Sequence, residues 1–343
     1  MNTKTVIALL VVIAAVLGVS LAFVIINQPV TPAAPATVVR VAPTPWSTFA
    51  SMYDTFDEVK NMWKGIEAKY NVSFSWTWTE EDVSTFFYGG SDVACIGPLE
   101  AAEIKFNRGL DVYVISNTLW NEDALVVNGD APYTSVRDLV GKKLANFGYD
   151  SGAYKYAEVL WAHEYGIDAG TDFEWIVAPP DVCVELVRKG EVEGALVYGG
   201  PWAVGIADYG MKLLYGPYTE ELKRLTGNYG AAIESLVVRK DLVVAHPEVA
   251  KALVDGWIQL YNFMAKDVDF YYRKFLEVSY GLTTQAQQDA FIKIQPFEKH
   301  IVEAGPLTDG QINSDMQLLT WAFEHGILEK APTEDLFYKV SLP

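Results

Sequence analysis

The residues best suited to bind a small molecule form a Gly-rich loop at positions 148–154, which reads Gly-Tyr-Asp-Ser-Gly-Ala-Tyr and precedes a helical pattern. Ser151 and Gly152 would let backbone N–H groups approach an acidic or carbonyl oxygen of a ligand, and the Ser151 hydroxyl adds a further donor. We therefore predict ligand contacts at Ser151, Gly152, Ala153 and Tyr154. The same residues would also suit an ordinary capped helix start that binds nothing.

A second set of candidate residues lies in a phrase that occurs twice. Residues 90–98 read Gly-Ser-Asp-Val-Ala-Cys-Ile-Gly-Pro, and residues 190–201 read Gly-Glu-Val-Glu-Gly-Ala-Leu-Val-Tyr-Gly-Gly-Pro. Each copy predicts a helix that ends at Gly, a short acidic turn, a buried strand and a Gly-Pro corner that begins another helix. Ligands of open α/β sheets bind at such corners, beside the carboxyl end of the strand. Two copies predict two lobes that face each other.

The predicted contacts at these corners are Gly97, Pro98, Tyr198, Gly199 and Trp202, with ordinary turn chemistry as the alternative. Trp46 and Ser47 follow the first predicted strand, and Trp120 and Asn121 stand beside a presumed passage between the lobes. Tryptophan can clamp a planar or aliphatic solute. The chain has 10 Trp, however, so most of them must serve packing. Trp76 and Trp78 are predicted to belong to the core.

Enzymatic chemistry finds little support in the sequence. The four histidines lie in separate helical segments, and no HExxH motif or paired-cysteine spacing occurs. The Gly-rich loop lacks the Lys-Ser/Thr of a nucleotide-binding P-loop. We predict no catalytic residue, no metal site and no cofactor. A Ser or Cys nucleophile that the fold brings to a histidine and an acid remains an open alternative.

The elements that must position these residues alternate between strand and helix. Strands are expected at 38–42, 72–78, 93–96, 112–115, 124–127, 142–147, 173–177, 194–197 and 233–238. One long helical pattern runs to about position 69, and the chain after position 241 is almost entirely helical. This order predicts an α/β fold with largely parallel sheets.

The first residues are set apart from this pattern. An apolar run at 6–26 is long enough to span a bilayer, and a small-residue cleavage site is available at 20–22. We predict a membrane anchor or signal segment at 1–27 and a Pro/Thr/Ala linker at 28–37. Lys4 on the short flank places the body outside the cell, tethered, or secreted or periplasmic if the segment is cleaved.

The body beyond residue 39 carries a net charge of about −19. Such a surface repels nucleic acid and anionic lipid headgroups, which excludes them as partners. Cys95 and Cys183 fall in different copies of the doubled phrase, so no disulfide is expected between them.

Several segments together resemble the solute-binding proteins of ABC importers, in the branch that handles nitrate, alkanesulfonates, taurine and thiamine precursors. They are the Gly-x-Asp-Val-Ala strand, V-R-D-L-V-G-K-K-L-A, the Tyr-Asp-Ser-Gly loop, V-R-K-G-E-V-E-G-A-L-V, and V-V-R-K-D-L-V-V-A-H-P-E-V-A-K-A-L. The resemblance covers nearly all of residues 38–300.

The resemblance implies a two-lobed periplasmic-binding-protein type 2 fold that closes on its solute about two crossing hinge strands, near 121–126 and 232–237. Lobe 1 would comprise 38–123 and 236–343, and lobe 2 would comprise 124–235. The implied function is delivery of a small solute to an ABC permease by a non-enzymatic receptor whose body is monomeric unless its N-terminal helix assembles copies.

The solute is left open. Lys155 and Arg239 are the nearest basic residues to the candidate loops, so an anion would rest mainly on helix dipoles and neutral donors. A pyrimidine, a flavin-like ring or an amine would suit the aromatic and acidic loops equally. Two other functions remain as alternatives: a structural surface or filament subunit assembled through the N-terminal helix, and a biosynthetic enzyme on this fold.

Overall fold

The computed structural model describes residues 36–79, 81–230 and 232–342, and the chain divides into two units at Ala36. The predicted anchor or signal segment at 1–27, and all but the last two residues of the predicted linker, lie outside the described residues. No helix among the described residues combines the length and apolar character needed to cross a membrane. All that follows concerns the unit Thr37–Pro343.

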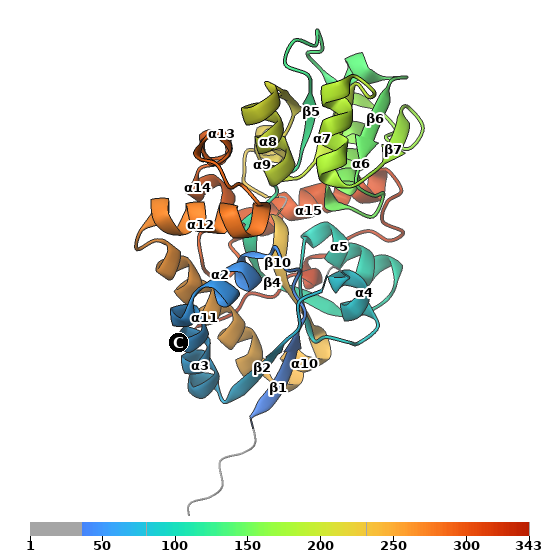
Figure 1. Ribbon diagram of the computed structural model, residues 1–343. Coiled ribbons are helices and arrows are strands. Elements are labelled where there is room, and N and C mark those ends of the chain that lie inside the picture. The colour runs from blue at the N-terminus through green and yellow to red at the C-terminus, as the bar shows by residue number, and fades with distance from the viewer. Residues whose placement is uncertain (1–35, 80, 231, 343) are drawn as a thin grey trace, which may run out of the picture. The chain divides into compact units, whose positions relative to one another are not determined.

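The first sheet has five strands. Their order is β2 (Val72–Trp76), β1 (Thr37–Val41), β3 (Val93–Ile96), β10 (Ala232–Arg239) and β4 (Val112–Trp120) (Figure 1). Strand β1 pairs in parallel with β2 and β3, whereas β10 runs antiparallel to both β3 and β4. Strand β4 continues to Trp120, well past the predicted end at position 115. Its polar residues 116–118 hid this extension, which pairs with β10 along its whole length.

The second sheet repeats this arrangement. Its order is β7 (Glu174–Val177), β6 (Lys143–Asn146), β8 (Gly194–Val197), β5 (Ala124–Val127) and β9 (Lys212–Tyr215). Strand β6 is parallel to β7 and β8, and β5 is antiparallel to β8 and β9. The strands of the doubled phrase, β3 and β8, therefore occupy the third place in both sheets. The expectation of equivalent positions for the two copies is confirmed, and so is the α/β class.

The helices of the first half follow the predicted order with one correction. They are α2 (Thr48–Thr55), α3 (Asp57–Tyr70), α4 (Asp82–Phe87), α5 (Pro98–Ala102), a π-helical turn η1 (Glu103–Asn107), the 3₁₀ turn η2 (Val136–Leu139), α6 (Gly152–Tyr165), α7 (Pro180–Lys189), α8 (Gly199–Tyr209) and α9 (Tyr218–Thr226). The single long helix predicted before position 69 is wrong. Phe56 is extended, with φ of −122°, and separates α2 from α3 while its ring packs on Phe263 and Tyr271.

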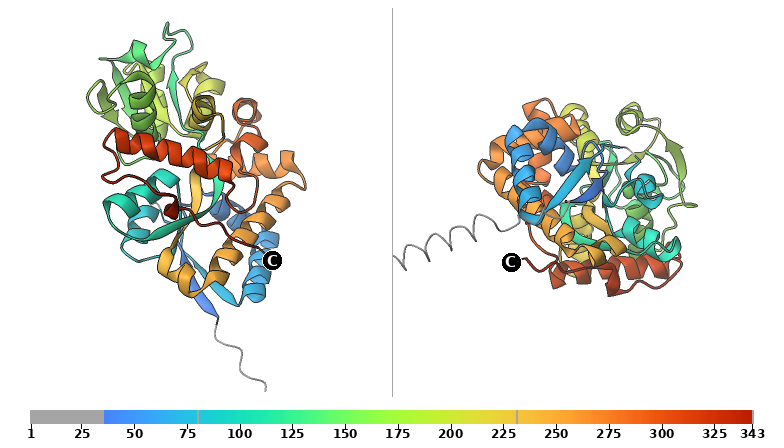
Figure 2. Two further views of the ribbon diagram at one scale, coloured as in Figure 1. Left: turned by 180° about the vertical axis from the view of Figure 1, so that it is seen from behind. Right: turned by 90° about the horizontal axis from the view of Figure 1, so that it is seen from below.

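The C-terminal part is helical, as predicted. It contains α10 (Lys240–Ala245), α11 (Pro247–Met264), α12 (Val268–Tyr280), α13 (Gln285–Ile294), α14 (Phe297–His300), α15 (Asp309–Glu324) and the short 3₁₀ turn η3 (Glu334–Leu336). Helix α11 packs on α3, α13 packs on α8, and α15 packs on α6, α9 and α5. Figure 2 shows α15 lying across the back of the body, between the two sheets. After β10, the C-terminal helices therefore pack both on helices beside the first sheet and on helices beside the second sheet.

The core beside the first sheet is rich in aromatic rings. Trp63 of α3 is buried and lies 5.1 Å, centroid to centroid, from Trp76, which is half-buried. Trp78 stacks obliquely on Trp76 but lies beyond the end of β2. Trp76 packs at the edge of the core, whereas Trp78 is half-buried and packs on Trp76 and Tyr53 beyond the end of the strand. The prediction that both belong to the core is therefore wrong for Trp78.

The contact between α3 and α11 predicts opposite effects for two helical glycines. A methyl group at Gly256 would lie 2.1 Å from Cη2 of Trp63, whereas one at Gly65 would meet no atom within 4 Å. We expect Gly256→Ala to lower the free energy of unfolding by about 1–3 kcal/mol through overpacking. Gly65→Ala should leave it unchanged or raise it by up to about 1 kcal/mol, because alanine favours a helix interior. Urea unfolding of both variants measures this, and equal effects of the two substitutions would contradict the packing described.

Candidate functional site

The chain passes from the first sheet to the second between β4 and β5, and helix α6 meets the first sheet close to this passage. The Tyr156 hydroxyl on α6 donates a hydrogen bond of 2.9 Å to the carbonyl oxygen of Ala232, the first residue of β10. At Gly152, the first residue of α6, a Cβ would lie only 2.5 Å from Cδ1 of Ile233. The first turn of α6 therefore sits directly on the strand that returns to the first sheet.

The first corner of the doubled phrase lies at the same place. Gly97 is the N-cap of α5, and a Cβ there would lie 2.8 Å from both the Tyr156 hydroxyl and the Ala232 carbonyl oxygen. Neither position accepts a side chain without displacing its neighbours. The structure thus brings together Gly97 and Gly152, which the sequence assigned to opposite lobes.

Two carboxylates converge on these glycines. The Cβ position of Gly152 lies 3.5 Å from Oδ2 of Asp123 and 3.6 Å from Oε1 of Glu100, and that of Gly97 lies 2.6 Å from Oε2 of Glu100. Glu100 belongs to α5, and Asp123 belongs to the link between β4 and β5. Both side chains are buried, and Oε2 of Glu100 and Oδ2 of Asp123 have no hydrogen-bond partner among the described residues.

Burial changes the protonation of both groups. It raises the pKa of Glu100 to about 7, an effect that the positive charge of Lys155 partly opposes. Burial also raises the pKa of Asp123 well above its usual range, and the charges of Glu122 and Glu100 add to this. Lys155 itself pairs with Glu103 at 2.5 Å, so its charge is already engaged.

Further acids surround this point. Glu234 on β10 accepts hydrogen bonds from the Thr118 hydroxyl at 2.8 Å and from the Thr48 amide at 3.0 Å, yet burial raises its pKa to about 7. Burial likewise raises the pKa of Asp82 to about 7, and the charge of Glu100 contributes. Oε1 of Glu122 accepts a hydrogen bond of 2.6 Å from the Tyr280 hydroxyl.

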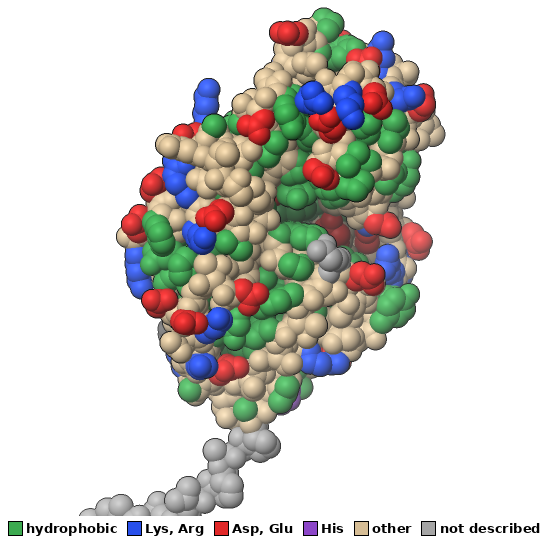
Figure 3. Space-filling view, viewed as in Figure 1, with side chains coloured by type: hydrophobic (Ala, Val, Ile, Leu, Met, Phe, Trp, Pro, Cys, Tyr) green, Lys and Arg blue, Asp and Glu red, His purple; other side chains and the backbone are tan. Residues whose placement is uncertain are grey.

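The molecular surface is hollowed near this region. Figure 3 shows a recess between the part of the body that holds the second sheet and the part that holds α4 and α5. Hydrophobic side chains line much of the recess, and acidic side chains gather at one end of it.

The two predicted serines act as helix caps. The Ser151 hydroxyl donates to the Gly148 carbonyl oxygen at 2.6 Å and accepts from the Tyr154 amide at 3.3 Å. The Ser47 hydroxyl accepts from the Ala50 amide at 3.1 Å. Local capping therefore accounts for the type of both residues, and for Ser151 this is the alternative given with the sequence.

The three predicted tryptophans lie in different surroundings. Trp46 is 45% exposed in the loop after β1. Trp120 is buried and stacks on Tyr229 at 5.9 Å. Trp202 is fully buried, stacks on Phe291 at 4.9 Å and donates its indole N–H to the Glu122 carbonyl oxygen at 2.9 Å.

The remaining predicted residues lie close to these elements. Pro98 is the first residue of α5, and the Asn121 side-chain oxygen accepts the Asp123 amide at 2.9 Å. Ala153 is buried, and its carbonyl oxygen accepts the Tyr218 hydroxyl at 3.0 Å.

Two tyrosines and a glycine complete the predicted set. Tyr154 packs edge-on against Tyr149 and Trp175, which belong to the same half of the body as the second sheet. Tyr198 is half-buried against Phe147 and Tyr280. A Cβ on Gly199 would lie 2.3 Å from Phe291, so this corner is closed by α13.

Sequence reasoning missed the acids. Glu100 is the one charged residue in the five-residue helix Pro98–Ala102, and Asp123 ends the polar triplet Asn-Glu-Asp between two apolar strands. A single charged residue in an apolar segment is unusual, and this pattern could have identified both acids as candidate site residues. Among the described residues, no group of three His, Cys, Asp or Glu side chains could hold a metal ion.

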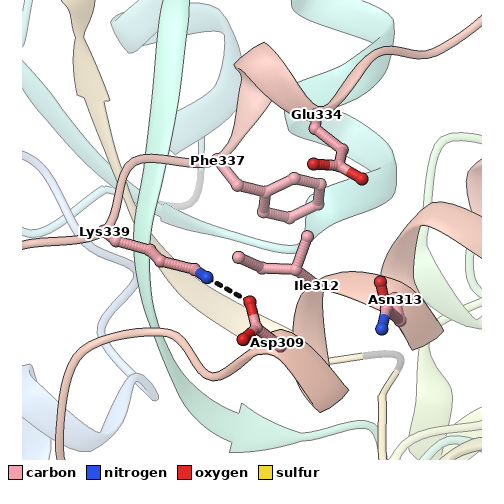
Figure 4. Close-up of a pocket in the computed structure, with 6 residues that line it drawn as sticks. All are labelled: Asp309, Ile312, Asn313, Glu334, Phe337 and Lys339. Carbon is pink, nitrogen blue, oxygen red and sulfur yellow. Dashed lines mark hydrogen bonds and ion pairs between the residues drawn. The ribbon is translucent and has the colours of Figure 1, made fainter.

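A separate pocket lies away from these residues. It has a volume of about 610 Å³ and lies between the first turns of α15 and the C-terminal segment (Figure 4). Lys339 pairs with Asp309 at its edge, and Phe337 and Ile312 form its apolar wall. None of the predicted site residues lines it.

The burial of Glu100 predicts a pH-dependent stability. Its raised pKa means that the folded chain binds more protons than the unfolded chain between about pH 4.5 and 7, so this group lowers stability as the pH rises through that range. We expect Glu100→Gln to raise the free energy of unfolding by up to about 3 kcal/mol above pH 7 and to have little effect near pH 4.5. Denaturant unfolding across this range tests it, and a benefit that is the same at both ends would contradict the assignment.

Comparisons with known proteins give the relationships of this chain. The model of the NMT1-like family matches residues 29–270. The taurine-binding periplasmic protein of Escherichia coli (strain K12) is 29% identical over 150 residues, which is 43% of this chain and 43% of that relative. The matched part of the chain thus spans less than half the length of this curated relative.

Solved structures align with a larger share of this chain. The alkanesulfonate-binding protein SsuA from Xanthomonas axonopodis pv. citri aligns with a TM-score of 0.66 at 13% identity, covering 89% of this chain and 99% of that one. The aliphatic sulphonate binding protein SsuA from Escherichia coli gives 0.67 at 11% identity, covering 89% and 93%. A Candida albicans protein with the generic periplasmic binding protein fold gives 0.59 at 16% identity, covering 89% and 97%.

These likenesses agree with the segments quoted from the sequence and with the two sheets of the structure. The resemblance to ABC-importer solute-binding proteins is confirmed, and the fold is that of the periplasmic binding proteins. The chain belongs to the NMT1-like family.

Proposed function

We propose that this protein is an extracytoplasmic solute-binding protein of an ABC importer, which captures a small organic molecule between two lobes and delivers it to a permease. The observation that carries the proposal is the meeting of Gly97 and Gly152 at one point. A corner from each half of the body faces the other, next to Ile233, Tyr156 and the carboxyl groups of Glu100 and Asp123. Binding sites of α/β proteins form at such strand ends.

The two sheets support the division into lobe 1, at 38–123 and 236–343, and lobe 2, at 124–235. The two passages of the chain between the sheets, next to Asn121 and next to Ala232, would then act as the hinge. A solute that contacts both lobes favours the closed state, because that state gains contacts which the open state lacks. Gly97 would contribute from lobe 1 and Gly152 from lobe 2, with Trp46 at the rim.

The side-chain chemistry favours binding over catalysis. Cys95 and Cys183 are both buried and unbridged, and burial raises the pKa of both thiols, which disfavours the reactive thiolate. The hydroxyls of Ser47 and Ser151 are engaged in helix caps. The named relatives are themselves binding proteins for taurine and sulfonates.

The proposal also implies a location and an oligomeric state for the protein. The apolar N-terminal run would tether the body to the outer face of the membrane or direct its export, and the receptor would work as a monomer beside its permease. These points rest on the sequence and on the family.

Blocking the meeting point should abolish solute binding. We expect a fraction of cell metabolites below about 1 kDa to stabilise the wild-type chain, since about 2.7 kcal/mol is gained when a ligand is present at a hundred times its Kd. Gly152→Leu should remove this gain, because its side chain would occupy the space beside Ile233 and Asp123. Gly305→Ala is the matched control, since a methyl group there meets nothing within 4 Å.

The measurement is the thermal unfolding temperature with and without the metabolite fraction, followed by native mass spectrometry to detect the bound molecule. Circular dichroism checks that Gly152→Leu remains folded. A wild-type chain that no metabolite stabilises, or a Gly152→Leu variant that responds fully, would refute the proposed function.

A further inference from the structure

We propose that the solute presents a protonated amine or amidine to Glu100 and Asp123, in a cluster of oxygen acceptors where the two halves of the body meet. The inference rests on the proposed function and names the chemical class of the solute: an organic cation, or a molecule with a cationic end. This class differs from the sulfonates named for the structural relatives.

Several hydrogen-bond acceptors lie next to the two glycines. Both oxygens of Glu100, Oδ2 of Asp123 and the carbonyl oxygen of Ala232 lie within 4 Å of the Cβ positions of Gly97 or Gly152. The Tyr156 hydroxyl also lies there, and it donates its hydrogen bond to Ala232. A carbonyl oxygen has two lone pairs, so Ala232 can accept a second donor. An ammonium group, with three donors and no acceptor, complements this set.

One oxygen of each carboxyl group lacks a donor in the described part of the chain, although both side chains are buried. Glu100 is 8% exposed and Asp123 is 2% exposed, and one oxygen of each has no donor among the described residues. Buried polar groups without partners are rare in folded proteins, and a buried unpaired charge is costly. A cationic solute would supply the missing donors and the missing charge at once.

Asn121 is fixed beside Asp123. Its side chain is fully buried, its oxygen accepts the Asp123 amide at 2.9 Å, and its side chain also hydrogen-bonds to the Asp123 carboxyl, which lowers the pKa of that group. Asn121 therefore positions Asp123, and Oε2 of Glu100 and Oδ2 of Asp123 are the buried carboxylate oxygens that a solute would meet.

The surrounding charge opposes an anion. Asp82, Glu122 and Glu234 are also buried around the meeting point. Lys155, whose charge acts on Glu100, is paired with Glu103. Where these acids are ionised, a sulfonate or nitrate placed here would be repelled, and Lys155 is shared between Glu100 and Glu103.

The raised pKa of Glu100 also predicts how cation affinity depends on pH. The titratable groups that act on Glu100 or are acted on by it are Glu103, Lys155, Tyr156, Asp123 and Asp82. Lys155 favours the ionised form of Glu100, whereas the acids oppose it. Because burial raises the pKa of Glu100 to about 7, this group holds a proton below that pH, and a bound cation would have to displace it. Cation affinity should therefore rise with pH, by up to about tenfold per unit below pH 7 for one proton released.

The test compares cations and anions of similar size on the purified full-length chain. The probes are benzylammonium, benzamidinium and ethylenediammonium, set against benzenesulfonate and nitrate, with thermal unfolding as the readout. We expect the cations to raise Tm at about pH 8, to do so less at about pH 6, and the anions to have no effect. Glu100→Gln and Asp123→Asn, which keep the shape of the side chains, should each reduce the cation response at least tenfold in Kd.

Asp130→Asn is the matched control, because Asp130 is an exposed acid away from the meeting point and its loss should leave the response intact. Stabilisation by benzenesulfonate or nitrate with none by the cations would overturn the cation assignment while leaving the solute-binding function in place. A lack of response to every cation, or a response that survives both substitutions, would also overturn it. Failure of the function itself would appear separately, as a wild-type chain that the metabolite fraction does not stabilise.

Discussion

The packing of helix α6 against the start of β10 is the contact on which the candidate site depends. Gly152 has no side chain, so the first turn of α6 can lie against Ile233, and the Tyr156 hydroxyl fixes this turn to the Ala232 carbonyl oxygen. The second sheet delivers α6, and the first sheet delivers β10. This contact therefore sets how closely two corners from different halves of the chain approach each other. A bulky residue at Gly152 would separate them, and the acids between them would become exposed to water.

The repeated sheet order explains why two such corners exist. In each sheet a parallel pair and a buried third strand are followed by an antiparallel strand that belongs to a passage between the sheets. Strand β3 is followed by Gly97, the N-cap of α5, and β8 is followed by Tyr198, the N-cap of α8, whose first residue is Gly199. The two corners nevertheless have different neighbours. The corner at Gly97 lies beside α6 and Glu100, whereas the corner at Gly199 is closed by Phe291 of α13.

The buried acids are an energetic cost that packing alone does not explain. Burial raises the pKa of Glu100 and Asp123, so each charge is disfavoured where it stands, and the charge of Lys155, which acts on Glu100, is shared with Glu103. Proteins keep such groups where they serve binding or catalysis, and the engaged serines and buried thiols favour binding. The apolar helix around Glu100 and the strands around Asp123 hold the two carboxylates in place. In the proposed function, that arrangement would reduce the entropy lost when a solute binds.

Much of the fold was predictable from local patterns. The alternation of strand and helix, the doubled phrase and the capping serines depend on neighbours in sequence, because hydrogen bonding within a turn and the burial of one face follow from residues a few positions apart. The break at Phe56 and the extension of β4 were not predictable in this way. Phe56 is held out of the helix by distant rings, and β4 is lengthened by pairing with a strand more than a hundred residues away. The same distinction applies to the site. The sequence determined which residues begin its helices, but only the tertiary structure placed Glu100 beside Asp123, because electrostatic pairing and desolvation depend on distance in space and on the packing of α6 against the first sheet.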